Sequence, residues 1–226
     1  MSLDLMDVFR KDYQMGYFHR NKKIFTLSII IFLIFAFVGY VAYDSVDDYN
    51  LDEEYEKEID GNIVSEDEDD FGLIVDDEVE SALFEDYNIG GFIELFIHNF
   101  SIDISCIIGG LFLSIPTLFT TFINGAMFGA IFTENPILIL FGVLPHGIFE
   151  IPSSLFALAG GFMLTSAELK LVKGLLSSKC TVRDKFQESV PLIKDAIISA
   201  GIVFILLFIA AFIETFITPV LMYLVI

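Results

Sequence analysis

The sequence predicts an all-α fold, a polytopic membrane helix bundle of about five transmembrane helices. The 226 residues are 55% hydrophobic and include 25 phenylalanines, and the mean hydropathy is +0.70. A soluble domain of this size would expose too much of that apolar surface. The apolar residues also form long runs, and a helix needs about 20 of them to cross about 30 Å of hydrocarbon.

The candidate membrane spans are the runs 24–43, 92–115, 117–133, 145–167 and 196–217. The first and last runs are the clearest. The middle three contain glycines and are interrupted by Pro116, Pro136, Pro145 and Pro152. Broken or re-entrant helices are therefore the alternative there, and such irregular backbone needs to be covered by protein or to line a wet cavity.

The basic residues predict how the chain is oriented in a cell membrane that it crosses several times. Of 12 lysines and arginines, five lie in 1–23, six lie in 168–195 and only Lys57 lies elsewhere. Because short basic segments stay in the cytoplasm, we expect the N-terminus and the basic connection 168–195 to be cytoplasmic. Segment 1–23 has apolar residues at helical intervals, which fits an amphipathic helix on the inner leaflet or an ordinary juxtamembrane tail.

The segment 44–91, expected to be an extracytoplasmic loop, holds 20 of the 32 acidic residues and one lysine. Such a composition is typical of a solvated, self-repelling loop. The alternative is a surface for a basic partner or for divalent cations. No stretch keeps the spacing of an EF-hand.

Ionisable residues inside the predicted spans are the candidate functional residues, because each costs roughly 2.5–3.5 kcal/mol in a bilayer. His98, Asn99 and Asp103 can share one face of a helix. They either hydrogen-bond across helices or mark an ion or proton path. His146 and Glu150 are four residues apart and therefore stack in a helix. Their pairing fits a structural clamp, half of a metal site or a proton-handling pair.

The predicted topology places several of these groups near the outer side of the membrane, where we hypothesise that they converge on one polar core. The predicted intramembrane polar cluster is His98, Asn99, Asp103, Asn124, His146, Glu150 and Glu214. Small residues predict close helix packing, at Gly125, Gly129, Gly160 and Gly161. Helix breaks are predicted at Pro145, Pro152 and Pro219.

No motif in the chain indicates an enzyme. The HExxH order of zinc proteases is absent, and there are only three histidines. Ser153 and Ser154 lack the motif of a nucleophile elbow, and there is no phosphate-cradling loop. We expect no catalytic residues, no cofactor, no metal site and no nucleic-acid partner.

Four segments resemble the stage II sporulation protein M family: His98-Asn99, where the family has Asn-Asn; Asn124-Gly125 with Gly129; 144–152 followed by Ala159-Gly160-Gly161; and 210–219, with its Glu-x-x-x-Thr-Pro ending. The resemblance covers 92–219 well, 1–43 loosely and the acidic segment not at all. It implies a multi-pass, non-enzymatic membrane protein, whose namesake is similar to a scaffold that anchors cell-wall-degrading partners.

The expected function is an integral membrane scaffold or assembly subunit, with a conformation held by intramembrane polar groups. Its partners are then the lipid bilayer, membrane or extracytoplasmic proteins and, through the glycine faces, further copies of itself. The alternative is a transporter or channel for ions or small solutes that uses Glu150 and Glu214.

Overall fold

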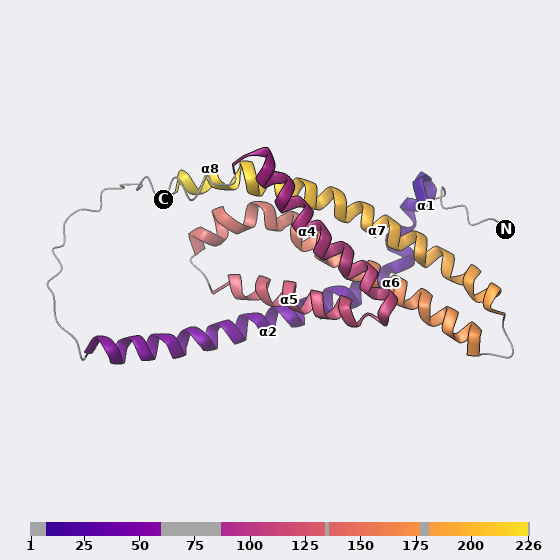
Figure 1. Ribbon diagram of the computed structural model, residues 1–226, viewed down its shortest axis with the longest axis horizontal. Helices are drawn as coiled ribbons and strands as arrows, with labels where there is room; N and C mark the ends of the chain where they lie inside the picture. The colour runs from indigo at the N-terminus through magenta and orange to yellow at the C-terminus, as the bar shows by residue number, and fades with distance from the viewer. Residues whose placement is uncertain (1–7, 60–86, 134–135, 177–180, 226) are drawn as a thin grey trace.

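The structure, a computed structural model, describes residues 8–59, 87–133, 136–176 and 181–225 (Figure 1). Its described part is helical, with the short α1 (Lys11–Met15) and the long α2 (Tyr17–Ile59) at the start. The remaining elements are α4 (Ile89–Gly109), the 3₁₀ turn η2 (Gly110–Phe112), α5 (Ile115–Ile131), the π-helical η3 (Leu138–Val143), α6 (Leu144–Leu176), α7 (Val182–Phe216) and α8 (Thr218–Tyr223).

Within the described residues, four helical segments are long and apolar enough to cross a membrane: Lys11–Ser45, Ile89–Phe112, Leu138–Leu176 and Val182–Tyr223. The predicted all-α membrane bundle is thus confirmed. The predicted span 117–133 is helical as α5, but α5 has 17 residues and is about 26 Å long at 1.5 Å per residue. It is therefore the shortest of the five apolar helices.

The α4–α5 turn differs from the expected continuous run 92–115. Leu113 and Ser114 have φ of 55° and 59°, the left-handed region, and α5 then begins with Pro116 in its first turn. Proline is well tolerated there because its missing N–H would be unbonded anyway. Two left-handed residues reverse the chain, so α4 and α5 form a tight helical hairpin.

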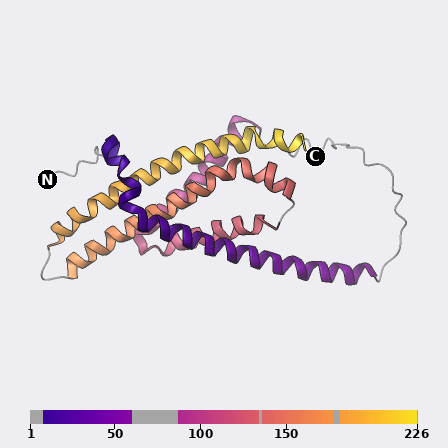
Figure 2. The same ribbon diagram turned by 180° about the vertical axis from the view of Figure 1, so that it is seen from behind.

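Helices α6 and α7 pack as an antiparallel pair, with α4 against both of them and against α5. Helix α2 packs mainly along α5 and also contacts α6. Figure 2 shows the N-terminal part of α2 crossing α6 and α7, and in both views its C-terminal part extends beyond α5.

The predicted loop 44–91 is helical in its first part, because α2 continues to Ile59. No glycine or proline occurs in 44–59, and these are the residues that most strongly oppose a helix interior. Residues 60–86 lie outside the described residues.

The prolines affect the helices less than predicted. Helix α6 runs through Pro152 without a break, because the helix around it is held by packing, with Ser153 and Ala157 completely buried. Pro145 lies in the first turn of α6, directly after the π-helical η3. A helix boundary does lie beside Pro219, since α7 ends at Phe216 and α8 begins at Thr218.

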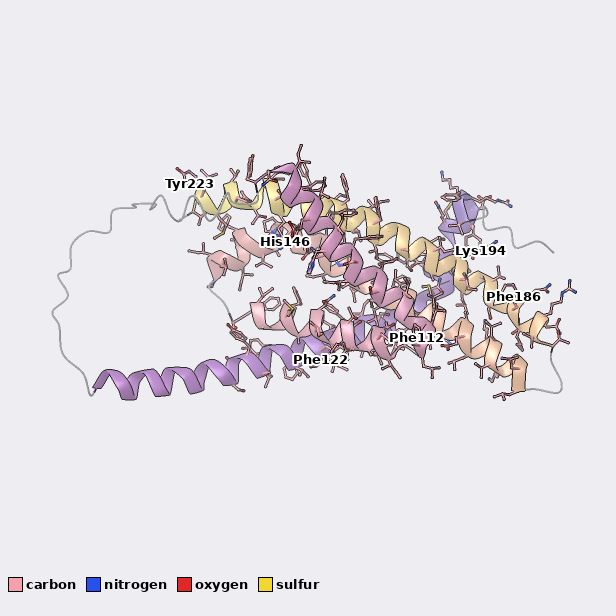
Figure 3. All side chains as sticks on the ribbon, viewed as in Figure 1. Phe112, Phe122, His146, Phe186, Lys194 and Tyr223 are labelled. Atoms are coloured by element: carbon pink, nitrogen blue, oxygen red, sulfur yellow. The ribbon has the colours of Figure 1, made fainter. Side chains whose placement is uncertain are left out.

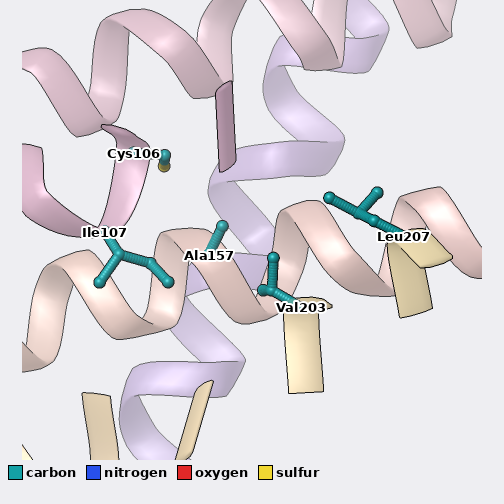
Figure 4. Packing of buried hydrophobic residues seen from close by; sticks show 5 residues of the cluster. All are labelled: Cys106, Ile107, Ala157, Val203 and Leu207. Atoms are coloured by element: carbon teal, nitrogen blue, oxygen red, sulfur yellow. The ribbon is translucent and has the colours of Figure 1, made fainter. Parts of the chain in front are cut away.

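The core between α4, α6 and α7 consists of small and medium-sized side chains: Cys106, Ile107, Ala157, Val203 and Leu207 (Figure 4). Further along α6, Ala159 and Met163 have no exposed surface.

The glycines bring helix backbones into direct contact. A Cβ on Gly110 would lie 2.1 Å from the carbonyl oxygen of Gly161, and one on Gly161 would lie 2.6 Å from Cγ2 of Thr117. The tightest contacts lie between α2 and α5, where a Cβ on Gly129 would lie 1.8 Å from the carbonyl oxygen of Ala36. A Cβ on Gly125 would lie 2.9 Å from Cβ of Phe35. These helix pairs therefore accept no larger residue at the glycine positions without moving apart.

Candidate functional site

A cavity of about 380 Å³ lies between α4, α5 and α6, with Phe32 of α2 and Leu207 of α7 completing its wall. Six of the seven residues of the predicted polar cluster line it: His98, Asn99, Asp103, Asn124, His146 and Glu150. They come from three helices that are up to about 50 residues apart in sequence, and His146 lies near the start of α6, where α4 passes it (Figure 3). The chain thus brings these polar groups to one place in the bundle.

Two hydrogen bonds, one helical turn apart, tie α4 to α6 at the cavity. The Asn99 amide donates to Oε1 of Glu150 over 2.8 Å, and the Ser153 hydroxyl donates to Oδ2 of Asp103 over 2.5 Å. Asp103 is 3% exposed. Because Asn99 and Asp103 are four residues apart, they lie on one face of α4 and meet successive turns of α6.

Other polar groups of the cavity have no partner in the described part of the chain. Nδ1 of His146 is buried without a hydrogen bond. The side chain of Asn124 lines the cavity and forms none of the hydrogen bonds found among the described residues. Glu150, which the sequence pairs with His146, is hydrogen-bonded to Asn99 instead. The cavity therefore holds hydrogen-bonding capacity that the described residues do not use.

Glu214, the seventh predicted residue, does not line the cavity. It lies near the end of α7, close enough to Glu150 for the two carboxyl groups to interact electrostatically. One turn later, Oγ1 of Thr218 is buried and has no hydrogen bond to any described residue. The signature 210–219 thus lies beside the cavity rather than in its wall.

The packed core closes one end of the cavity. Along α4 the lining residues Asn99 and Asp103 are followed by the buried Cys106, and Leu207 belongs to both the cavity wall and the core. The hydroxyl of Thr117 on α5 donates to the carbonyl of Cys106 over 2.7 Å, which fixes the two helices beneath the cavity. The cavity is therefore closed on the side of the α4–α5 turn.

A second polar cluster, which the sequence did not indicate, fastens the start of α2 to α7. Arg20 binds both carboxylate oxygens of Asp195, with Nη2 to Oδ1 at 2.6 Å and Nε to Oδ2 at 3.2 Å. Asn21 donates to Oδ2 of Asp195 over 2.7 Å, and the hydroxyls of Tyr17 and Ser199 are 2.6 Å apart.

The one signal in the sequence that could have indicated this cluster is Asp195, an acidic residue directly before the apolar run 196–217. An unpaired carboxylate at that border would be costly. Its partners are far away in sequence, so spacing alone could not identify them. Tyr17, expected on the inner leaflet or in a tail, is 2% exposed and packs in the protein core.

The sequence model of the family described as stage II sporulation protein M matches residues 28–219. This range contains the whole cavity wall and Glu214, but not Tyr17 or Arg20 at the start of α2. No curated protein and no solved structure matches the chain. The matched range covers most of the 226 residues, and the chain therefore belongs to the stage II sporulation protein M family.

Proposed function

We propose that this protein is a non-enzymatic integral membrane scaffold or assembly subunit, with a helix arrangement held by intramembrane polar groups. The proposal rests on two hydrogen bonds that polar groups of the cavity wall form between helices. Asn99 with Glu150, and Ser153 with Asp103, join α4 to α6, and the cavity ends against a packed core. These contacts support a fixed bundle rather than a continuous solute path.

The contacts of α2 support the same function. Backbone contacts at Gly129 and Gly39 hold α2 against α5, so the two helices are placed with little freedom. Beyond residue 45, α2 continues for about 20 Å at 1.5 Å per residue, with acidic residues predominating in 46–59. A rigid bundle with a projecting acidic helix is suited to holding a membrane or extracytoplasmic partner with a basic surface.

The orientation proposed from the basic residues has structural support. Arg20, in the basic N-terminal segment, binds Asp195 at the end of the basic connection 168–195. The two basic segments therefore meet at one end of the bundle, which fits a common cytoplasmic side. The projecting end of α2 is then extracytoplasmic.

A transporter or channel for ions or small solutes is the second candidate, favoured by the cavity itself. Asp103 and Glu150 line it, and Glu214 of α7 lies within electrostatic range of Glu150. Carboxyl groups at this depth are typical of ion and proton pathways. Such a function requires a second conformation in which the packed core beneath the cavity opens.

The two functions differ in what they require of Glu150. We would crosslink the protein in native membranes, identify co-purifying proteins by mass spectrometry, and compare Glu150→Gln with Glu94→Gln. Glu94 is an exposed carboxyl group on the same helix as Asn99. A scaffold should keep a reproducible partner in both variants.

Ion flux would be measured in parallel, with the same variants reconstituted in liposomes. A flux that Glu150→Gln abolishes and Glu94→Gln preserves, with no partner recovered, would overturn the scaffold and establish the transporter. A partner retained without any flux would support the scaffold.

A further inference from the structure

The cavity has the size of a small-molecule site. Ligand pockets are typically about 300–1,000 Å³ in volume, with mostly apolar walls and a few convergent polar groups. This cavity measures about 380 Å³, and its walls alternate polar groups with side chains such as Ile123, Met127 and Ile151. The packed core adjoins the cavity at Leu207, so a molecule inside would contact the core at that end.

The polar groups of the wall include two carboxyl groups, Asp103 and Glu150, and several groups that can both donate and accept hydrogen bonds. Asn99 donates to Oε1 of Glu150, and Oε2 forms none of the hydrogen bonds found among the described residues. Asp103 is buried and held by Ser153. Nδ1 of His146 is buried without a partner and accepts a hydrogen bond when the ring proton is on Nε2. The Asn124 side chain adds an amide oxygen. No lysine or arginine is among the residues that line the cavity.

This balance favours a ligand that donates hydrogen bonds, and a cationic donor would in addition stabilise the charged form of the Glu150 carboxyl group. A directly coordinated metal ion fits poorly. Among the described residues, no group of three or more His, Cys, Asp and Glu side chains is arranged to hold one. Metal sites built from protein side chains alone need about that many.

The apolar part of the wall indicates that the cation is organic and has an apolar substituent. The rings of Phe32 and Phe128, with centroids 5.9 Å apart, both line the cavity, and aromatic faces attract organic ammonium groups. The aliphatic side chains can take a short alkyl chain. A bare inorganic ion would leave this apolar surface unused.

The geometry points to a binding site for an alkylammonium group, with Glu150, Asn124 and His146 beside the charged nitrogen and the apolar wall around its carbon chain. The ammonium group comes either from a free small amine or from the headgroup of an aminophospholipid. This inference goes beyond the scaffold function and stands or falls independently of it, since the test measures binding alone.

The test uses the full chain in nanodiscs made only of phosphatidylcholine, with n-butylammonium as the probe and 1-butanol as its neutral counterpart. Binding is followed by saturation-transfer NMR and by the midpoint of thermal unfolding. We expect a saturable signal and a rising midpoint with n-butylammonium alone. A second set of nanodiscs contains phosphatidylethanolamine, which would itself raise the midpoint and compete with n-butylammonium if the headgroup is the natural ligand.

The variants distinguish a built site from non-specific uptake. Glu150→Gln should weaken binding at least tenfold, whereas Glu94→Gln, outside the cavity, should not. Asn124→Ala is the second site variant, because its side chain forms no hydrogen bond found among the described residues and its loss should leave the fold intact. It should weaken binding about threefold or more.

Saturable binding in phosphatidylcholine alone would support a free amine, and a response confined to phosphatidylethanolamine would support the lipid headgroup. An equal response to 1-butanol, no saturable response in either nanodisc, or unchanged binding by folded Asn124→Ala would overturn the proposal.

Discussion

Replacing Gly129 with alanine should separate α2 from α5. The added Cβ would lie 1.8 Å from the carbonyl oxygen of Ala36 and 2.8 Å from the backbone nitrogen of Tyr40. Both neighbours are backbone atoms, so no side-chain rotation relieves the clash. Ordinary contact begins at 3.4 Å, which means that the two backbones must move apart locally by about 1.6 Å.

This displacement sets the expected cost. A gap of 0.5–1 Å already forfeits a quarter to a half of a van der Waals contact, and overpacking of a tight interface typically costs about 1–3 kcal/mol. The neighbouring contact at Gly39, where a Cβ would lie 2.1 Å from the Ala126 carbonyl oxygen, opens with it. We therefore expect Gly129→Ala to lower the free energy of unfolding by about 2–3 kcal/mol.

The assay is unfolding of the purified protein in mixed micelles by increasing SDS, followed by far-UV circular dichroism because the chain has no tryptophan. Gly201→Ala is the matched control. A Cβ there meets nothing within 4 Å, and alanine is favoured over glycine in a helix by about 0.5–1 kcal/mol. The two variants should change stability in opposite directions. Equal stability of Gly129→Ala and wild type would refute the backbone contact.

Three further predictions concern the polar contacts. Arg20→Met leaves the Asp195 carboxylate, 2% exposed, without its main partner and should cost about 1.5–3 kcal/mol of unfolding free energy in the same assay; a loss near zero would contradict the ion pair. Tyr17→Phe removes one buried hydroxyl contact and should cost about 0.5–1.5 kcal/mol, whereas unchanged stability would mean that the contact contributes nothing. Glu150→Gln and Glu214→Gln, measured singly and together, should differ from additivity by at least about 0.5 kcal/mol, and strict additivity would show that the two carboxyl groups act independently.

The polar cluster could be predicted from the sequence because few environments in a membrane accommodate an ionisable side chain. An ionisable residue in an apolar run must face protein or water, so His98, Asp103 and Glu150 were expected to meet inside the bundle. Six of the seven predicted residues line one cavity. The glycine contacts were predictable for the same reason, since close approach of helices requires small side chains.

Other features depended on partners that spacing does not reveal. Asp195 binds Arg20, which is about 175 residues away in the sequence, and no local pattern indicates this pairing. Pro152 was expected to break its helix, but tertiary packing around Ser153 outweighs the lost backbone hydrogen bond. The helical state of 44–59 was not predicted, because the density of acidic residues in 44–91 indicated a solvated, self-repelling loop.

Helix α2 is held at two places, and this has a mechanical consequence. One fastening is the contact of Tyr17, Arg20 and Asn21 with α7. The other is the backbone contact at Gly39, about 28 Å from Arg20 along the helix at 1.5 Å per residue. A rod clamped at two separated points can neither pivot nor slide. If the contacts at the start of α2 are released, the helix can pivot about Gly39. A shift at Arg20 would then move the end of α2 near Ile59 by a comparable distance in the opposite direction.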